Sequence, residues 1–286
     1  MKLSVAVGSD QAGDSAFVVW RGFERSIKKA AEFGYDGVEL ALRTPDDLSP
    51  GKLRTWLKDY HMEVSCITTG RVFAESGLFF THPEEAVRKQ TVEVFEQMID
   101  LASEFGGMVN AGRVRGMIGE GQTRKEAETL FLDTALAICR KAEAKGVTLA
   151  VEPVNRYEIN FINSLDEGAA LLERSGCDRI GLHADVFHMN IEDDRIGDSL
   201  VRNGKWIRYV HLADTNRLAP GMGHMDFDEI FRALQTIGYD GWVSMEMLPG
   251  EDADQSARQA VSYIRPMMEA YHAGYYRRRE AVHEKC

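Results

Sequence analysis

The chain has 286 residues and a mass of 32.1 kDa, with 44% apolar and 28% charged residues, which is enough to bury a large core. Its 45 acidic residues outnumber its 34 basic ones, and the formal net charge of −11 opposes binding to nucleic-acid phosphates. No apolar run of about 18 residues and no signal-peptide core occurs. We therefore expect a soluble cytoplasmic enzyme or binding protein, with no nucleic-acid or membrane partner.

The four cysteines lie far apart in the sequence, at positions 66, 139, 177 and 286, and none belongs to a Cys-x-x-Cys pair. This spacing predicts neither a disulfide framework nor a cysteine zinc site. It also indicates a reducing compartment.

Short apolar segments alternate with amphipathic helical segments along the whole chain. The predicted strands are Leu3–Val7, Gly37–Leu42, Val64–Thr68, Met108–Ala111, Thr148–Val154, Ile180–Asp185, Ile207–Ala213 and Trp242–Met247. Helical periodicity is clearest where Phe95, Met98 and Ala102 recur on one face. Strands that are apolar throughout, each followed by a helix, predict a parallel sheet covered on both faces. Eight such units predict a closed α/β (β/α)₈ TIM barrel.

One helix-to-strand junction occurs twice, because Phe33–Leu40 resembles Ile237–Ser244, and both contain Gly-Tyr-Asp-Gly. In each, the first glycine suits a left-handed helix end and Asp-Gly turns the chain into the next strand. No linker divides the sequence, so we expect one domain over residues 1–286. The sequence from about residue 275 is basic and is expected to be a solvated tail.

The last four predicted strands each end on a residue that can bind a metal: Glu152, Asp185, His211 and Glu246. They are spaced by about one βα repeat, and the carboxyl ends of barrel strands converge at one mouth. Each follows an apolar run and would lose its water unless it were paired or bound to a cation. Three carboxylates and an imidazole predict one divalent cation, with Mn²⁺ preferred and Co²⁺ or Mg²⁺ as alternatives.

Three further polar residues lie just beyond these strand ends: Glu158, His188 and Arg217. A single loop charge of this kind is usually a solvated surface group. Next to a metal site, however, a carboxylate, an imidazole and a guanidinium can bind the oxygens of a polyol. We therefore predict that these residues contact the substrate.

The segments 151–158, 185–192 and 211–217 resemble the ketose 3-epimerases, which include the D-tagatose and D-psicose 3-epimerases of the xylose isomerase-like barrel superfamily. The strings Asp-Val-Phe-His-Met-Asn-Ile-Glu and Asn-Arg-Leu-Ala-Pro-Gly carry the resemblance, which fits the whole chain in length and element order. It implies the same four metal ligands and the same three sugar contacts. It also implies a sugar substrate and, because relatives are dimers or tetramers, a homodimer or homotetramer.

The loop after the fourth predicted strand, residues 110–116, lacks the aromatic wall of the enzymes that act on free ketohexoses and looks closer to the 5-keto-L-gluconate epimerase branch. On that resemblance, Arg115 could bind a substrate carboxylate in forked geometry. The residues alone favour surface charges for both Arg113 and Arg115. His183 is expected to be a barrel-lining imidazole rather than a partner of the ligands.

The ligand set and the resemblance together predict inversion at C3 of a ketose or keto-sugar acid through an enediolate. Epimerisation needs a base on one face of the carbon and an acid on the other. Glu152 and Glu246 lie on well-separated strands, so we expect them to exchange these two roles.

Other reactions on the same barrel remain open. An aldose–ketose isomerase of the hydroxypyruvate isomerase type would move the proton between C1 and C2, and a lyase of the inosose dehydratase type would expel water. A repair nuclease of the endonuclease IV type needs more histidines and a basic face, which the acidic composition opposes. A non-catalytic sugar-binding barrel would not need the complete ligand set.

Overall fold

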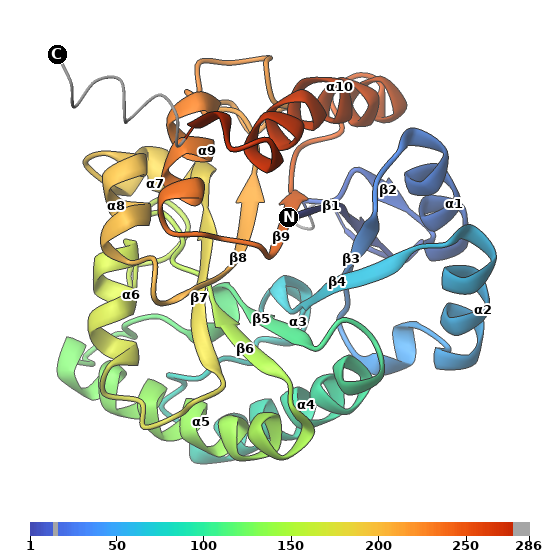
Figure 1. The fold of residues 1–286 in the computed structure, drawn as a ribbon. Helices are drawn as coiled ribbons and strands as arrows, with labels where there is room; N and C mark the ends of the chain where they lie inside the picture. Colours follow the sequence, from blue (N-terminus) through green and yellow to red (C-terminus); the bar gives the residue numbers. More distant parts are fainter. Residues whose placement is uncertain (14–16, 277–286) are drawn as a thin grey trace, which may run out of the picture.

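Eight parallel strands close into a barrel in the computed structural model, which describes residues 1–13 and 17–276 (Figure 1). In barrel order the strands are β1 (Lys2–Gly8), β3 (Gly37–Ala41), β4 (Glu63–Thr68), β5 (Met108–Ala111), β6 (Thr148–Val151), β7 (Ile180–Asp185), β8 (Ile207–Leu212) and β9 (Trp242–Met245). β1 pairs with β9 as well as with β3, which closes the sheet. The predicted (β/α)₈ barrel is confirmed as a single domain.

The sequence-based strand boundaries differ from the observed ones by a few residues at most. β6 ends at Val151 instead of Val154, because Pro153 has no N–H to donate to a strand ladder. A two-residue strand, β2 (Trp20–Arg21), pairs with the end of β1 and was not predicted. Its length is too short for an alternating pattern to reveal it.

Helices surround the strands on the outside of the barrel, except α3, which Figure 1 shows within the ring of strands. They are α1 (Phe23–Phe33), α2 (Pro50–Tyr60), α3 (Gly70–Ser76), α4 (Glu85–Glu104), α5 (Arg124–Lys145), α6 (Leu165–Leu172), α7 (Val186–Glu192), α8 (Ile196–Arg202), α9 (Phe227–Thr236) and α10 (Ala253–His272), with short 3₁₀ turns η1 (Pro45–Asp47) and η2 (Arg113–Arg115). Phe95, Met98 and Ala102 are fully buried on α4, as their periodicity predicted. No helix within residues 1–13 and 17–276 is both long and apolar enough to span a bilayer.

The repeated Gly-Tyr-Asp-Gly sequence forms the same junction twice. Gly34 and Gly238 have φ angles of 89° and 66°, the left-handed region that favours glycine. The amide groups of Tyr35 and Tyr239 then donate to carbonyl oxygens of the preceding helix, at 3.0 and 2.9 Å. Both junctions direct the chain from a helix into a barrel strand.

The predicted basic tail lies almost wholly at residues 277–286, outside the described residues. Tyr276, at the edge of that prediction, is buried. Its ring stacks on Phe231 and its hydroxyl donates to Asp228 at 3.1 Å. The chain is therefore packed against the barrel as far as this residue.

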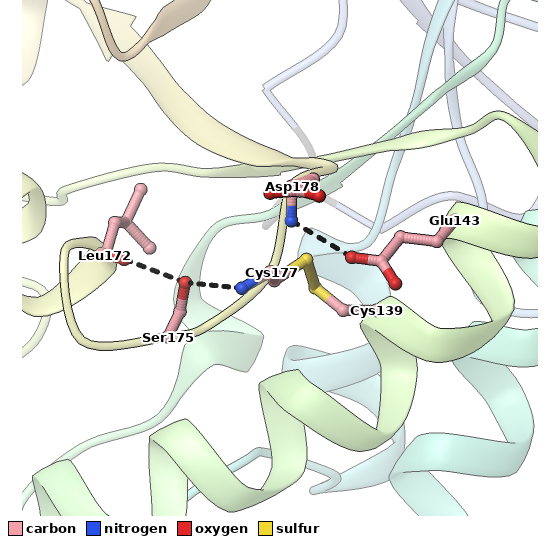
Figure 2. The surroundings of a disulfide bond; sticks show 6 residues. All are labelled: Cys139, Glu143, Leu172, Ser175, Cys177 and Asp178. Carbon is pink, nitrogen blue, oxygen red and sulfur yellow. Dashed lines mark hydrogen bonds between the residues drawn. A yellow bond between two sulfur atoms is a disulfide. The ribbon is translucent and has the colours of Figure 1, made fainter.

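Cys139 and Cys177 form a disulfide, so the expectation that the chain has no disulfide is wrong (Figure 2). Cys139 lies on α5 and Cys177 in the connection between α6 and β7, and both are buried. The two cysteines are 38 residues apart and meet only because α5 packs beside that connection, where Asp178 N–H also donates to Glu143 at 3.0 Å. The cysteine pattern therefore no longer supports a reducing compartment.

Breaking this cross-link should destabilise the barrel. In the chain-entropy description, a closed loop of this length stabilises a fold by about 2–4 kcal/mol. We expect the Cys139→Ala/Cys177→Ala variant to unfold at lower urea concentration than the wild type, by an amount that corresponds to that free energy. The wild type should show two fewer reactive thiols in denaturant than its four cysteines allow.

The double variant also serves as the control for the effect of a reductant. The reductant should lower the urea midpoint of the wild type and leave that of the variant unchanged. Four reactive thiols in unreduced wild-type protein would contradict the cross-link.

Candidate active site

The four predicted metal ligands meet at the carboxyl ends of neighbouring strands. Asp185 is the last residue of β7 and His211 is the next-to-last residue of β8. Glu152 and Glu246 directly follow β6 and β9. One ligand atom from each lies within 4.8 Å of the other three. Parallel strands bring residues that are far apart in the sequence to one mouth, as the spacing predicted.

The donor atoms surround a common point and fit a cation. His211 Nδ1 lies 3.8 Å from Glu152 Oε1, 3.7 Å from Asp185 Oδ2 and 3.6 Å from Glu246 Oε2. Within the described residues, His211 Nδ1 and Asp185 Oδ2 are buried and have no hydrogen-bond partner. Buried polar atoms without partners are costly, and a divalent cation would satisfy both. Oxygen donors with one imidazole suit Mn²⁺, Co²⁺ or Mg²⁺ better than a thiolate-binding metal.

Glu39, which the sequence analysis missed, fixes the orientation of His211. It is fully buried on β3, and its Oε2 lies 2.7 Å from His211 Nε2 and accepts a hydrogen bond from Tyr209 at 2.8 Å. Ser65 Oγ is in turn 2.6 Å from the Tyr209 hydroxyl. A carboxylate at Nε2 holds the proton there and leaves the Nδ1 lone pair for the cation. A single acid inside the apolar strand 37–41 was the available signal.

Two asparagines, also missed, orient the remaining side chains. Asn110 Nδ2 donates to Glu152 Oε2 at 2.9 Å and lies 2.6 Å from His183 Nδ1. Asn155 Nδ2 donates to Glu158 Oε1 at 3.1 Å and lies 2.8 Å from His188 Nδ1.

His188, Glu158 and Arg217, the predicted substrate contacts, lie around the ligands. His188 Nε2 is 3.5 Å from Asp185 Oδ2. Arg217 Nη2 contacts Glu246 and lies 3.5 Å from Asp185 Oδ2, and its guanidinium packs on the ring of Phe187. Its Nε and Nη1 are buried and make no hydrogen bond within the described residues, and Nη1 lies 3.9 Å from Glu158 Oε1.

The backbone of Arg217 has an unusual conformation, with a φ of 59° in the left-handed region. Asp214 stabilises this loop, because its carboxylate accepts from the N–H groups of Thr215, Gly221 and Met225. Such strain persists only where surrounding contacts fix the chain, and it clusters at functional sites.

Burial and mutual repulsion shift the acidity of the carboxylates. Burial raises the pKa of Glu152 to about 8, and the charge of Glu246 adds to the increase. Burial also raises the pKa of Glu246, although Arg217 opposes the shift. Burial favours protonated Asp185 as well, but His188, His211 and Arg217 together hold its pKa well below the usual range. The two glutamates therefore gain protons more readily than ordinary carboxylates.

The two histidines shift in opposite directions. Burial lowers the pKa of His188 to about 3, so this imidazole is neutral at pH 7. Burial acts on His211 in the same sense, but Glu39 and Glu246 reverse it and raise the pKa of His211 well above its usual value. If these residues held a divalent cation, His211 Nδ1 would give up its proton and bind the ion with its lone pair.

A cavity of about 50 Å³ lies beside these groups and is partly open to solvent. Glu152, Glu158, His188, Arg217 and Glu246 line it. The lining also includes apolar and polar side chains: Ala6, Phe17, Val18, Ala41, Thr68, Arg71 and Arg113.

Arg115 is not where the sequence analysis placed it. It is fully buried, so the interpretation as a surface charge is wrong. It also does not line the cavity, because its guanidinium donates to the carbonyls of Gly112, Phe161 and Ile162 at 3.0, 2.6 and 2.7 Å. Those contacts leave no forked face for a substrate carboxylate. Its neighbour Arg113 is half-buried and does line the cavity.

His183 lies below the ligands, inside the barrel. It is fully buried, and its ring stands edge-on to that of His211 with centroids 3.9 Å apart. Together with its contact to Asn110, this places it against one candidate ligand, His211, and against the support of another, Glu152.

The fold and the site thus define a barrel protein with a candidate metal centre at the mouth where barrel enzymes hold their substrates. The model of the xylose isomerase-like TIM barrel family matches residues 27–267, and the chain belongs to that family.

Curated relatives are named as sugar epimerases. The chain is 33% identical over 237 residues to L-ribulose 3-epimerase of Mesorhizobium japonicum, covering 82% of this chain and 78% of the relative. It is 36% identical over 225 residues to D-psicose 3-epimerase of Ruminiclostridium cellulolyticum, covering 77% and 76%. A solved structure of L-ribulose 3-epimerase superposes with a TM-score of 0.80 at 28% identity over 97% of each chain. These relatives confirm the resemblance to ketose 3-epimerases and the expectation of an isomerase-class carbohydrate epimerase.

Cation binding should depend steeply on pH. The ion needs ionised Glu152 and a lone pair on His211, and both groups bind protons more readily here than in water. Protons therefore compete with the ion, and the affinity for Mn²⁺ should fall about tenfold per pH unit for each proton displaced as pH drops below about 8. Calorimetric titration in two buffers of different ionisation enthalpy measures the released protons. An affinity that is constant from pH 6 to 8.5 would contradict this competition.

Glu39→Gln should weaken Mn²⁺ binding by about 10–100-fold, because the neutral amide no longer holds the proton on His211 Nε2 as firmly. Glu63→Gln is the matched control, since this glutamate is exposed on neighbouring β4 and pairs with Lys2. Equal Mn²⁺ affinities for the two variants would exclude a role for Glu39 in the centre.

Proposed function

We propose that the protein inverts the configuration at C3 of a ketose or keto-sugar acid, with Glu152 and Glu246 exchanging the proton. Two carboxylates with raised pKa values, the buried Glu152 and the half-buried Glu246, lie beside one candidate cation site, and this arrangement carries the proposal. The names of the relatives support the same reaction.

A divalent cation, when bound, lowers the barrier to removing the proton by polarising the substrate carbonyl and stabilising negative charge on its oxygens. The four ligands Glu152, Asp185, His211 and Glu246 would hold it. We favour Mn²⁺ because of this donor set.

The two glutamates supply the acid and the base. β6 and β9 are separated by two strands in the barrel order, so Glu152 and Glu246 approach the cavity from different sides. One carboxylate removes the C3 proton and the other delivers a proton to the opposite face, and the reverse reaction exchanges these roles. Raised pKa values bring both groups closer to the pH at which they can both give and accept protons.

The neighbouring side chains hold the substrate and the developing charge. Asn155 occupies Nδ1 of His188, so this neutral imidazole presents an Nε2–H donor to a substrate oxygen. Arg217 adds positive charge and two unused donors where the enediolate oxygens would lie. Glu158 accepts a hydrogen bond from a hydroxyl group and orients the carbon chain.

The remaining part of the cavity would set the choice of substrate. Arg113, Arg71 and Thr68 line it, but Arg71 already pairs with Asp47 and Glu75. We therefore infer a sugar whose distal end carries hydrogen-bonding oxygens, either the hydroxyl of a ketose or the carboxylate of a keto-sugar acid. The 5-keto-L-gluconate branch, a cytoplasmic location and a homodimer or homotetramer remain predictions.

The reaction class can be tested with Mn²⁺-loaded protein in D₂O, using L-ribulose, D-psicose, D-tagatose and ketogluconates and NMR detection. Epimerisation places one deuterium at C3 and leaves the formula otherwise unchanged. Deuterium at C1 or C2 would instead identify an aldose–ketose isomerase, and loss of water a lyase.

Glu152→Gln and Glu246→Gln should each lower turnover by about 10²–10⁴-fold, because an amide cannot exchange the proton. Both residues are also ligands, so Mn²⁺ affinity must be measured and turnover compared at saturating metal. Glu173→Gln, an exposed glutamate that pairs with Lys205, is the control and should keep full activity. Near-native turnover in either test variant would exclude the two-carboxylate scheme.

A further inference from the structure

Arg115 is a buried cation that makes no ion pair. It is fully inaccessible, and in the part of the chain that the structure describes no carboxylate forms a salt bridge with it. Its charge is stabilised by three backbone carbonyls instead. Burying a guanidinium without an ion pair costs free energy. This cost indicates that the hydrogen bonds it makes have a role at this place.

Two of those carbonyls flank a strained residue. Ile162 has a φ of 52°, a left-handed conformation that is rare for a β-branched side chain. Nη2 of Arg115 donates to the carbonyls of Phe161 and Ile162. The Ile162 carbonyl also accepts from Val154 N–H at 3.3 Å, which closes the loop of residues 154–162 at its base.

This loop carries substrate-binding groups. Asn155 lies at its start, and its amide group contacts both Glu158 and His188. The Asn155 carbonyl accepts from Glu158 N–H at 3.0 Å, so the position of Glu158 follows from the base of the loop. A shift at residues 161 and 162 would therefore reach the groups that are proposed to hold the sugar.

The third carbonyl connects Arg115 to a carboxylate of the proposed acid–base pair. Nη1 donates to Gly112, whose N–H donates to Asn110 Oδ1 at 2.9 Å, and Asn110 donates to Glu152. Gly112 packs so closely that a Cβ there would lie 2.7 Å from Glu152 Oε2. The same guanidinium thus joins the support of Glu152 to the support of Glu158 and His188.

We propose that Arg115 is a positioning residue, whose forked hydrogen bonds lock the strained turn at Ile162 to the Gly112 turn and so fix Glu152 relative to Glu158 and His188. The inference rests on the proposed function for its catalytic consequence. Its geometric part, the locking of residues 154–162, stands on the contacts alone.

The test compares Arg115→Met and Arg115→Lys with the wild type as Mn²⁺-loaded proteins. Without the fork, amide hydrogens of residues 154–162 should exchange at least about tenfold faster, while those of β7 and β8 keep their rates. At saturating substrate, Arg115→Met should lower kcat by about 100-fold, because displacement of reacting groups by about 1 Å has that effect. Arg115→Lys keeps the charge but not the fork and should lower kcat by about tenfold.

Two controls separate positioning from general stability. Arg174→Met removes an exposed arginine that pairs with Glu128, and Ile180→Val loosens the barrel core at β7. Both should keep kcat within about twofold, even where the melting temperature falls as far as in the Arg115 variants.

Unchanged exchange in residues 154–162, or unchanged kcat despite faster exchange, would overturn the proposal. If the Met variant does not fold, the Lys variant decides by the same two measurements. A wild type that epimerises no sugar would overturn the proposed function instead, and the exchange rates would still decide whether Arg115 locks the loop.

Discussion

Repulsion between acidic groups in a place with little water is the constraint on which the site depends. Glu152 and Asp185 are almost inaccessible and Glu246 lies close to both, so their negative charges cannot be screened by solvent. Protons, Arg217 and a cation are the three available sources of compensation. The pKa values of Glu152 and His211 are both raised, which means that these groups hold protons more firmly because the site has little other positive charge.

Other buried side chains at the barrel mouth hold the charged groups in position. Glu39 orients the imidazole of His211, and Asn110 orients the carboxylate of Glu152. Asn155 orients Glu158 and His188. Each of these supports is buried and comes from a different strand or loop of the barrel. Because the strands are fixed by hydrogen bonds to their neighbours, the donors converge without a flexible element between them.

Sequence reasoning recovered the barrel and the clustering of the four candidate ligands because both follow from local patterns. An apolar strand that ends on Asp185 or Glu246 reveals itself in a few residues. The supports could not be found in this way, since Glu39 and His211 are 172 residues apart and meet only through strand order. The disulfide escaped for the same reason. Arg115 was misjudged because a single loop arginine is usually a solvated charge, whereas its three acceptors are backbone atoms that no side-chain pattern encodes.

Tyr209 extends the influence of the centre across the barrel. Its hydroxyl contacts Glu39 on β3, Ser65 on β4 and, at 3.3 Å, Ser4 on β1. Neither serine is a candidate ligand or one of the residues that line the cavity, yet both share a continuous polar chain with His211. Substitutions selected in the laboratory for a different metal preference can thus arise deep in the barrel interior, at positions that a search confined to the pocket walls would pass over.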